Sequence, residues 1–234
     1  MHNQIEVLVV RFSNELKIDE IPLFRGAVVE LVGETGNVLF HNHASDNKLR
    51  YSYPFIQYKR INGKAAIVCV KEGVEEIGRL FAVGEMDVRI GNRLDCLRVE
   101  KLNAPKSIVQ VWDAEFEYHI RKWLPLNQEN YEKYMAIESL AEKYAMLENL
   151  LVGNILSFAK GVGIHFEKQV VCKITAIDDP RIITYKGVKM MAFDAEFKSN
   201  VSIPDYVGLG KGVSLGMGTV VRKYEKKNED SVNE

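Results

Sequence analysis

Alternation between apolar and polar side chains organises the first half of the chain. Residues 5–12 are rich in valine and isoleucine and predict a β-strand. A proline near its start favours a helix over residues 22–32, because proline is tolerated in the first helical turn. Two further strands are predicted at residues 53–59 and 65–70. Asn62-Gly63 lies between them and is typical of a type I′ hairpin turn, which needs positive φ at both central residues.

The rest of this half completes a known order of elements. The pattern predicts a helix over residues 73–83 and a pair of strands over residues 86–102. The order strand, helix, strand, strand, helix, strand is that of the ferredoxin-like (βαββαβ, RRM-like) fold. Loop-forming residues at 103–105 then mark a boundary, so we assign a first domain to residues 1–104.

The second half reads as another, less regular α+β unit. A strand is predicted near residues 108–116, followed by one long helix over residues 127–158, and alternating residues at 191–197 predict a half-buried strand. The helix carries an apolar stripe at steps of three and four. This stripe consists of Ile137, Leu140, Tyr144, Leu147, Leu151 and Ile155. We therefore expect an α+β protein with two tandem ferredoxin-like domains, residues 1–104 and 105–221. The charged residues 222–234 form a disordered tail in this interpretation.

Composition agrees with a globular chain that has a real core. Hydrophobic residues make up 47% of the 234 residues and charged residues 27%. The sequence contains neither a signal peptide pattern nor an apolar run of the roughly 20 residues that a membrane helix needs. The three cysteines, Cys69, Cys96 and Cys172, are far apart in apolar contexts and predict buried free thiols. We expect a cytoplasmic protein without a membrane contact, with Trp112 and Trp123 in the core.

The charge balance argues against a general nucleic-acid binder, but positive charge is concentrated locally. The chain has 31 basic and 32 acidic residues and a net charge of −1. Residues 41–64 contain five basic residues against one aspartate. The five are Lys48, Arg50, Lys59, Arg60 and Lys64. Such a patch suits recognition of a short stretch of RNA better than non-specific coating.

A glycine-rich segment at residues 207–220 is the strongest local motif. It reads VGLGKGVSLGMGTV, with two Gly-apolar-Gly units separated by five residues. It fits neither the Walker A pattern nor the dinucleotide-binding fingerprint. Exposed amides at glycine positions bind phosphate well, and a lysine within the segment adds charge. The prediction is an RNA-binding loop, with close packing of a bulged strand pair as the structural alternative. Its candidate contacts are Gly208, Gly210, Lys211, Gly212, Gly216 and Gly218.

His41 and His43 form the candidate catalytic pair. Residues two apart on an extended segment face the same side, so both imidazoles can reach one phosphodiester. Histidine titrates near neutrality, which suits proton transfer to and from an RNA backbone. The alternatives are two solvated surface histidines or part of a metal site. No third ligand has convincing spacing, so we expect neither a metal nor another cofactor.

Several residues resemble those of the CRISPR repeat-processing endoribonucleases of the RAMP superfamily. The resemblance rests on the spacing of the glycines and on Tyr185-Lys186-Gly187-Val188, Phe193-Asp194 and Pro204-Asp205-Tyr206-Val207 before them. In the first half it rests on residues 39–43 and 53–59. It implies two ferredoxin-like domains in tandem and metal-independent cleavage of precursor CRISPR RNA within its repeats. Met217 departs from the aromatic residue that many members carry, which weakens stacking on a base but not phosphate contacts.

The resemblance gives the neighbouring residues their expected roles. Cleavage proceeds by attack of a 2′-hydroxyl, giving a 2′,3′-cyclic phosphate and a 5′-hydroxyl. Lys48, Arg50 and Lys59 are candidate cations for the transition state, Tyr51 or Tyr53 orients the phosphate, and Arg50 and Arg60 are candidate RNA contacts. The partner implied is CRISPR repeat RNA, with other CRISPR effector subunits and a homodimer as further options. A catalytically silent RNA-binding subunit, or an interaction protein that binds no RNA, stays open as an alternative.

Overall fold

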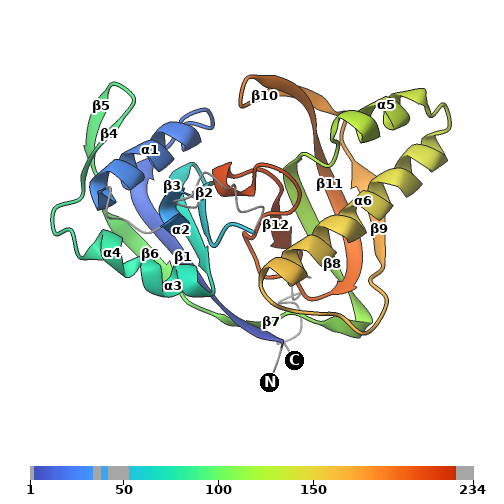
Figure 1. The fold of residues 1–234 in the computed structure, drawn as a ribbon, viewed down its shortest axis with the longest axis horizontal. Coiled ribbons are helices and arrows are strands. Elements are labelled where there is room, and N and C mark those ends of the chain that lie inside the picture. The colour runs from blue at the N-terminus through green and yellow to red at the C-terminus, as the bar shows by residue number, and fades with distance from the viewer. Residues whose placement is uncertain (1–2, 34–37, 42–52, 225–234) are drawn as a thin grey trace, which may run out of the picture.

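The computed structural model describes residues 3–33, 38–41 and 53–224 and contains two five-stranded antiparallel sheets (Figure 1). Each sheet is covered on one face by helices, and residues 202–220 lie between the two halves. The α+β prediction with two sheet-dominated domains is confirmed. Within the described residues, no helix has the length and apolar character required to cross a bilayer.

The first sheet has the strand order of a ferredoxin-like domain. Strand β1 lies centrally between β3 and β6, and β2 is the outer neighbour of β3. The helices α1, α3 and α4 occupy the two crossover positions, and a separate β4–β5 hairpin precedes β6. In chain order these elements are β1 (Gln4–Glu15), α1 (Ile21–Val32), α2 (Val38–His41), β2 (Ile56–Ile61), β3 (Lys64–Val70), α3 (Glu72–Glu76), α4 (Gly78–Phe81), β4 (Asp87–Ile90), β5 (Arg93–Cys96), β6 (Val99–Asn103) and β7 (Lys106–Ile108).

The second sheet repeats this order with one element missing. Strand β8 lies between β11 and β12, and both β9 and β10 pair with β11. The chain between β11 and β12 contains the glycine segment and one short 3-10 turn, η1, in place of a second helix. The elements are β8 (Val111–Trp123), α5 (Gln128–Ala136), α6 (Leu140–Gly161), β9 (Cys172–Ile177), β10 (Arg181–Tyr185), β11 (Val188–Val201), η1 (Val213–Leu215) and β12 (Thr219–Arg222).

Three expectations about helices and core residues are wrong. The predicted single helix at 127–158 is broken, because Ser139 adopts an extended backbone and its hydroxyl caps the amide of Glu142. Leu140, within the predicted stripe, is therefore 68% exposed. The helix at 73–83 is likewise two short helices, α3 and α4. Trp123 is buried as expected, whereas Trp112 lies at a strand end and is 38% exposed.

The two domains share one apolar core. In the first domain, one face of the sheet packs on its own helices. The opposite face, including Val7, Val9 and Val68, belongs to the same cluster as α6 and the second sheet. This cluster also takes up Val207 and Leu209 of the glycine segment. The glycine segment is therefore held where the two domains meet.

Candidate nucleic-acid interface

The glycine segment folds into a compact loop with tight backbone requirements. Gly212 and Gly216 flank η1 with φ of 72° and 80°, in the left-handed region that favours glycine. A Cβ on Gly218 would overlap the carbonyl oxygen of Leu209, and Gly218 also has a φ of +61°. Gly208 and Gly218 are buried, whereas Lys211 is exposed. Close packing thus accounts for the glycines, and RNA binding by this loop stays a prediction.

Two polar residues of the first domain anchor the start of the loop. The Tyr53 hydroxyl donates to the Gly208 carbonyl at 2.9 Å and accepts from the Gly208 amide at 3.2 Å. Gln57, fully buried on β2, accepts from the same amide at 3.1 Å and donates to the Tyr53 hydroxyl at 2.9 Å. Burial raises the pKa of Tyr53 above its ordinary range. Tyr53 is therefore a neutral structural contact of the loop.

Lys59 supports the C-terminal end of the same loop through hydrogen bonds. Its side chain is 1% exposed, and its ammonium donates to the Thr219 hydroxyl at 3.1 Å. That hydroxyl in turn donates to the Gly216 carbonyl at 3.1 Å. Burial lowers the pKa of Lys59 to about 7. The lysine predicted to face a phosphate thus contacts the protein instead.

We expect Lys59→Met to flatten the alkaline rise in stability. The folded pKa of Lys59 is about 7 and the ordinary value is 10.5. Between these values the unfolded chain binds more protons, so the free energy of unfolding increases with pH by up to about 1.4 kcal/mol per unit. Urea unfolding of wild type and variant from pH 7 to 9.5 measures this difference. Lys211→Met, at an exposed lysine, is the control; an equal pH slope in wild type and Lys59→Met would contradict the expectation.

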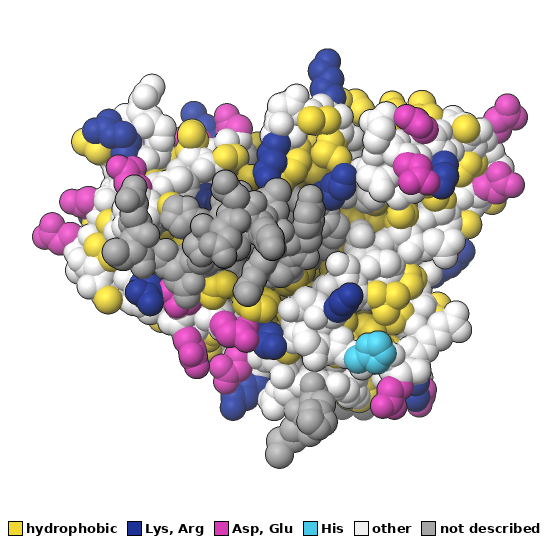
Figure 2. Space-filling model, viewed as in Figure 1, with side chains coloured by type: hydrophobic (Ala, Val, Ile, Leu, Met, Phe, Trp, Pro, Cys, Tyr) yellow, Lys and Arg dark blue, Asp and Glu magenta, His cyan; other side chains and the backbone are white. Residues whose placement is uncertain are grey.

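A basic cleft opens beside this loop. Its volume is about 500 Å³, and both domains line it together with Gly216 and Thr219. The arginine, lysine, histidine and aspartate side chains in its wall are Arg60, His119, Arg121, Lys122, Arg181 and Asp194. Figure 2 shows Lys and Arg side chains near the middle of the face it presents, where the two halves of the molecule meet.

Asp194, the acidic residue in the wall of the basic cleft, is hydrogen-bonded to neighbouring residues. The Asp194 carboxylate accepts from the Lys122 backbone amide at 2.6 Å and from the Arg181 guanidinium at 2.6 Å. Arg60 donates its Nε to the Leu16 carbonyl, and both Arg60 and Arg121 are exposed. The cleft therefore presents a surplus of positive charge to solvent, which suits an anionic polymer.

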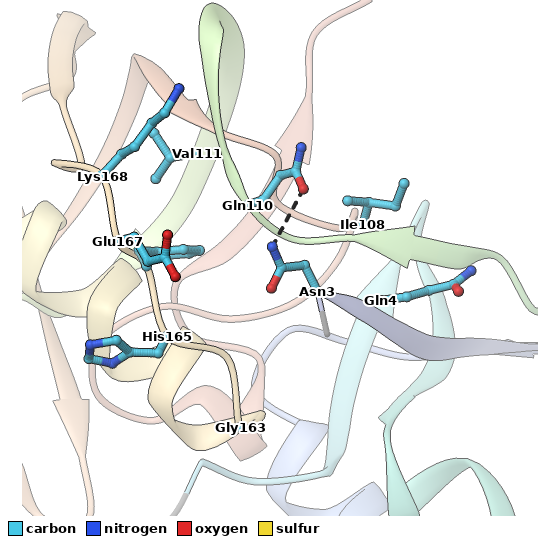
Figure 3. Close-up of a pocket in the computed structure, with 10 residues that line it drawn as sticks. Asn3, Gln4, Ile108, Gln110, Val111, Gly163, His165, Glu167 and Lys168 are labelled. Atoms are coloured by element: carbon cyan, nitrogen blue, oxygen red, sulfur yellow. Dashed lines mark hydrogen bonds between the residues drawn. The ribbon is translucent and has the colours of Figure 1, made fainter. Parts of the chain in front are cut away.

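A larger hollow lies elsewhere, near the N-terminus, and its chemistry differs (Figure 3). It has a volume of about 940 Å³ and is lined by amides such as Asn3 and Gln110, whose side chains approach at 3.5 Å. Lys168 in its wall is paired with Asp113 at 2.9 Å, and Glu167 adds a negative charge. Because this hollow has no surplus of cations, the basic cleft is the better candidate for a phosphate backbone.

Apart from Tyr53 and the residues within the glycine loop, the structure separates the predicted site residues. Arg60 and Gly216 line the basic cleft, whereas Lys59 is buried and bonds to Thr219 in its wall. His41 is the last residue of α2, directly after the buried Phe40, which anchors this helix in the first domain. The predicted His43, Lys48, Arg50 and Tyr51 lie outside the described residues, as do residues 225–234 of the predicted tail. Arg222 and Lys223, assigned to that tail, are the end of β12 and the residue after it.

Sequence reasoning missed the basic residues of β8. Here His119 and Arg121 alternate with the buried Tyr118 and Ile120, so they share the face of the second sheet that points away from α6. The His119 side chain is 37% exposed, and its Nδ1 lies 3.3 Å from the Glu196 carboxylate. The alternation of apolar and basic residues over 118–121 was the available signal.

Two family models match the chain in succession. The Cas6b N-terminal domain matches residues 3–107, and the Cas6b C-terminal domain matches residues 110–223. The chain belongs to the Cas6b family. This confirms the resemblance to the CRISPR repeat-processing RAMP proteins that the glycine spacing and the histidine region indicated.

Solved structures agree with this assignment. A crystal structure of Cas6b is 27% identical, has a TM-score of 0.83, and the match covers 94% of this chain and 100% of that chain. A structure described as CRISPR RNA processing endoribonuclease Cas6b is 24% identical with a TM-score of 0.71 and the same coverage. A RAMP protein binding different RNA substrates shares the fold at 12% identity and a TM-score of 0.54, over 94% of this chain and 99% of that one.

A curated relative also matches part of this Cas6b chain. An uncharacterised protein of Methanocaldococcus jannaschii is 38% identical over 106 residues. The match covers 45% of this chain and 71% of that protein.

Proposed function

We propose that this Cas6b protein is a metal-independent endoribonuclease that cleaves precursor CRISPR RNA within its repeats. The observation that carries the proposal is the basic cleft, to which both domains and the glycine loop contribute. A cleft of this charge is complementary to an RNA backbone. Family membership supports the same activity, since one related Cas6b is described as a CRISPR RNA processing endoribonuclease.

The chemistry proposed for His41 and His43 needs only two proton transfers. One imidazole removes the proton of a ribose 2′-hydroxyl, and the oxygen attacks the adjacent phosphorus. The other protonates the departing 5′-oxygen, so the products are a 2′,3′-cyclic phosphate and a 5′-hydroxyl. Cations such as Lys48 or Arg50 stabilise the charge that builds up on the phosphate oxygens.

The buried residues have a supporting role in this proposal. Tyr53 and Lys59 contact the glycine loop rather than solvent, so they hold the loop against the first domain. The amides of Gly208, Gly216 and Gly218 donate to other groups of the protein, which removes them as phosphate contacts. We propose that the exposed Lys211 then contacts the RNA backbone. Arg60 adds a phosphate contact from the wall of the basic cleft.

Incubation of the protein with a repeat RNA from the CRISPR array of the same genome, with and without EDTA, tests the proposal. We expect equal cleavage at one position within the repeat under both conditions. Cleavage that stops in EDTA would refute metal independence. Tight binding without turnover would favour a silent RNA-binding subunit, and no binding even at low salt would leave only an interaction protein.

The basic cleft makes a separate prediction about affinity. The double variant Arg121→Ala/Arg181→Ala should bind the repeat RNA more weakly. The slope of the logarithm of the association constant against the logarithm of the salt concentration should become less negative by about 1.4 for single-stranded RNA. Fluorescence anisotropy over a salt series measures both. Arg79→Ala, at an exposed arginine of α4, is the matched control. A salt slope equal to that of wild type would show that RNA does not enter the basic cleft.

A further inference from the structure

Another hollow, distinct from the larger one near the N-terminus, shares one lining residue with the basic cleft. Its volume is about 320 Å³, and we name it the Tyr224 pocket. Tyr206 lines both this pocket and the basic cleft. Its polar and aromatic lining includes Asn103, Ser107, Asp205, Tyr206, Arg222 and Tyr224. Thr219 and Val221 of β12 line the basic cleft, whereas Arg222 lines the Tyr224 pocket, so a polymer that occupies both must pass around β12 at Tyr206.

Arg222, in the wall of the Tyr224 pocket, packs against two aromatic rings, of which Tyr224 lines the pocket. The Arg222 guanidinium carbon lies 4.3 Å from the Phe116 ring centroid and 5.4 Å from that of Tyr224. Tyr224 is 70% exposed, so part of its side chain is accessible to a ligand. Aromatic rings interleaved with arginine are the groups on which unpaired bases stack.

Hydrogen bonds fix this wall in place. The Asp205 carboxylate accepts from the Arg222 amide at 2.7 Å and from the Tyr224 hydroxyl at 3.5 Å. Tyr206 next to it has a φ of +67°, a left-handed conformation that costs free energy in a residue with a bulky side chain. Its amide donates to the Val220 carbonyl at 2.7 Å, which holds this conformation against β12.

The size and polarity of the Tyr224 pocket select one class of ligand. A volume of about 320 Å³ suits one base with its sugar and is too small for a helix of a partner protein. Asn103, Ser107 and Asp205 offer donors and acceptors for the edge of a base. Because the basic cleft, which shares Tyr206 with this pocket, suits a phosphate backbone, RNA is favoured over a peptide.

We infer that the Tyr224 pocket binds one unpaired base of the RNA whose backbone lies in the basic cleft. The inference rests on the proposed function, since it requires RNA in that cleft. It adds a contact that reads an unpaired nucleotide by stacking, apart from the histidine pair and the glycine loop.

Repeat RNAs with 2-aminopurine at single unpaired positions test this inference, because the fluorescence of this base falls when it stacks. We expect binding to quench the probe at one position. Tyr224→Ala should remove that quenching and weaken affinity about tenfold, whereas Tyr224→Phe should retain both. Tyr131→Ala, at an exposed tyrosine of α5, is the matched control and should behave as wild type.

The outcomes separate this inference from the proposed function. If Arg121→Ala with Arg181→Ala weakens RNA binding but Tyr224→Ala changes neither quenching nor affinity, the inference is overturned and the proposed function stands. The same result is expected if the Tyr224 pocket binds a peptide and not RNA. If the arginine variant also binds RNA as wild type does, RNA in the basic cleft is refuted, and the inference with it.

Discussion

The double variant His41→Ala/His43→Ala is expected to bind repeat RNA with wild-type affinity and to lose cleavage by at least about 10³-fold. General acid and general base catalysis each contribute to the same transition state, so removing both groups leaves only binding and positioning. Single-turnover cleavage at saturating protein measures the loss, and anisotropy measures affinity.

The control for the double variant is a histidine outside the proposed chemistry. His165 is exposed near the end of α6, so His165→Ala should cleave as wild type does. Unchanged cleavage in the His41→Ala/His43→Ala variant would show that other residues carry out the proton transfers. The first alternative would then be His119, the histidine in the wall of the basic cleft.

Gly218→Ala is expected to destabilise the protein by about 4 kcal/mol or more, a loss that few single substitutions cause outside severe packing conflicts. The new methyl group would overlap the carbonyl oxygen of Leu209, and φ at this position is +61°. Because Gly218 is buried between β8 and the loop, neither backbone can move away without breaking the Gly218–Lys122 and Leu209–Gly218 hydrogen bonds. Urea unfolding followed by circular dichroism measures the change.

Gly187→Ala separates backbone strain from packing. Gly187 has a φ of +79°, but a Cβ there would meet no atom within 4 Å. Its expected cost is therefore only the roughly 1–2 kcal/mol of a left-handed alanine. Equal destabilisation by the two substitutions would show that the loop relaxes freely, which would contradict the close packing of Gly218 against Leu209.

Local features of the chain were predictable because their causes are local. The hairpin at Asn62-Gly63 has the two positive φ values that its turn requires, and so does Lys186-Gly187. The break before α6 also has a local cause, the Ser139 cap. The apolar stripe continues across this break, so the pattern predicts one uninterrupted helix. Leu140 fits the stripe, yet it lies beyond the surface that the sheet covers.

Contacts between the domains could not be predicted in the same way. Gln57 and Lys59 alternate with apolar residues on β2, which predicts a solvent-facing side. In the structure the second domain covers that side, and both residues are buried against the glycine loop. The basic cleft has the same origin, since Arg60 and Arg181 are brought together only by the packing of two domains.

Cleavage of repeat RNA in EDTA, with the product ends identified and a parallel RNA carrying a single 2′-deoxyribose at the cleaved nucleotide, tests the central claim most directly. The proposed mechanism predicts a 2′,3′-cyclic phosphate and a 5′-hydroxyl from the unmodified RNA. It predicts no cleavage of the deoxy-substituted RNA at that position, because the nucleophile is missing. A 5′-phosphate product, or cleavage that survives the 2′-deoxy substitution, would contradict it.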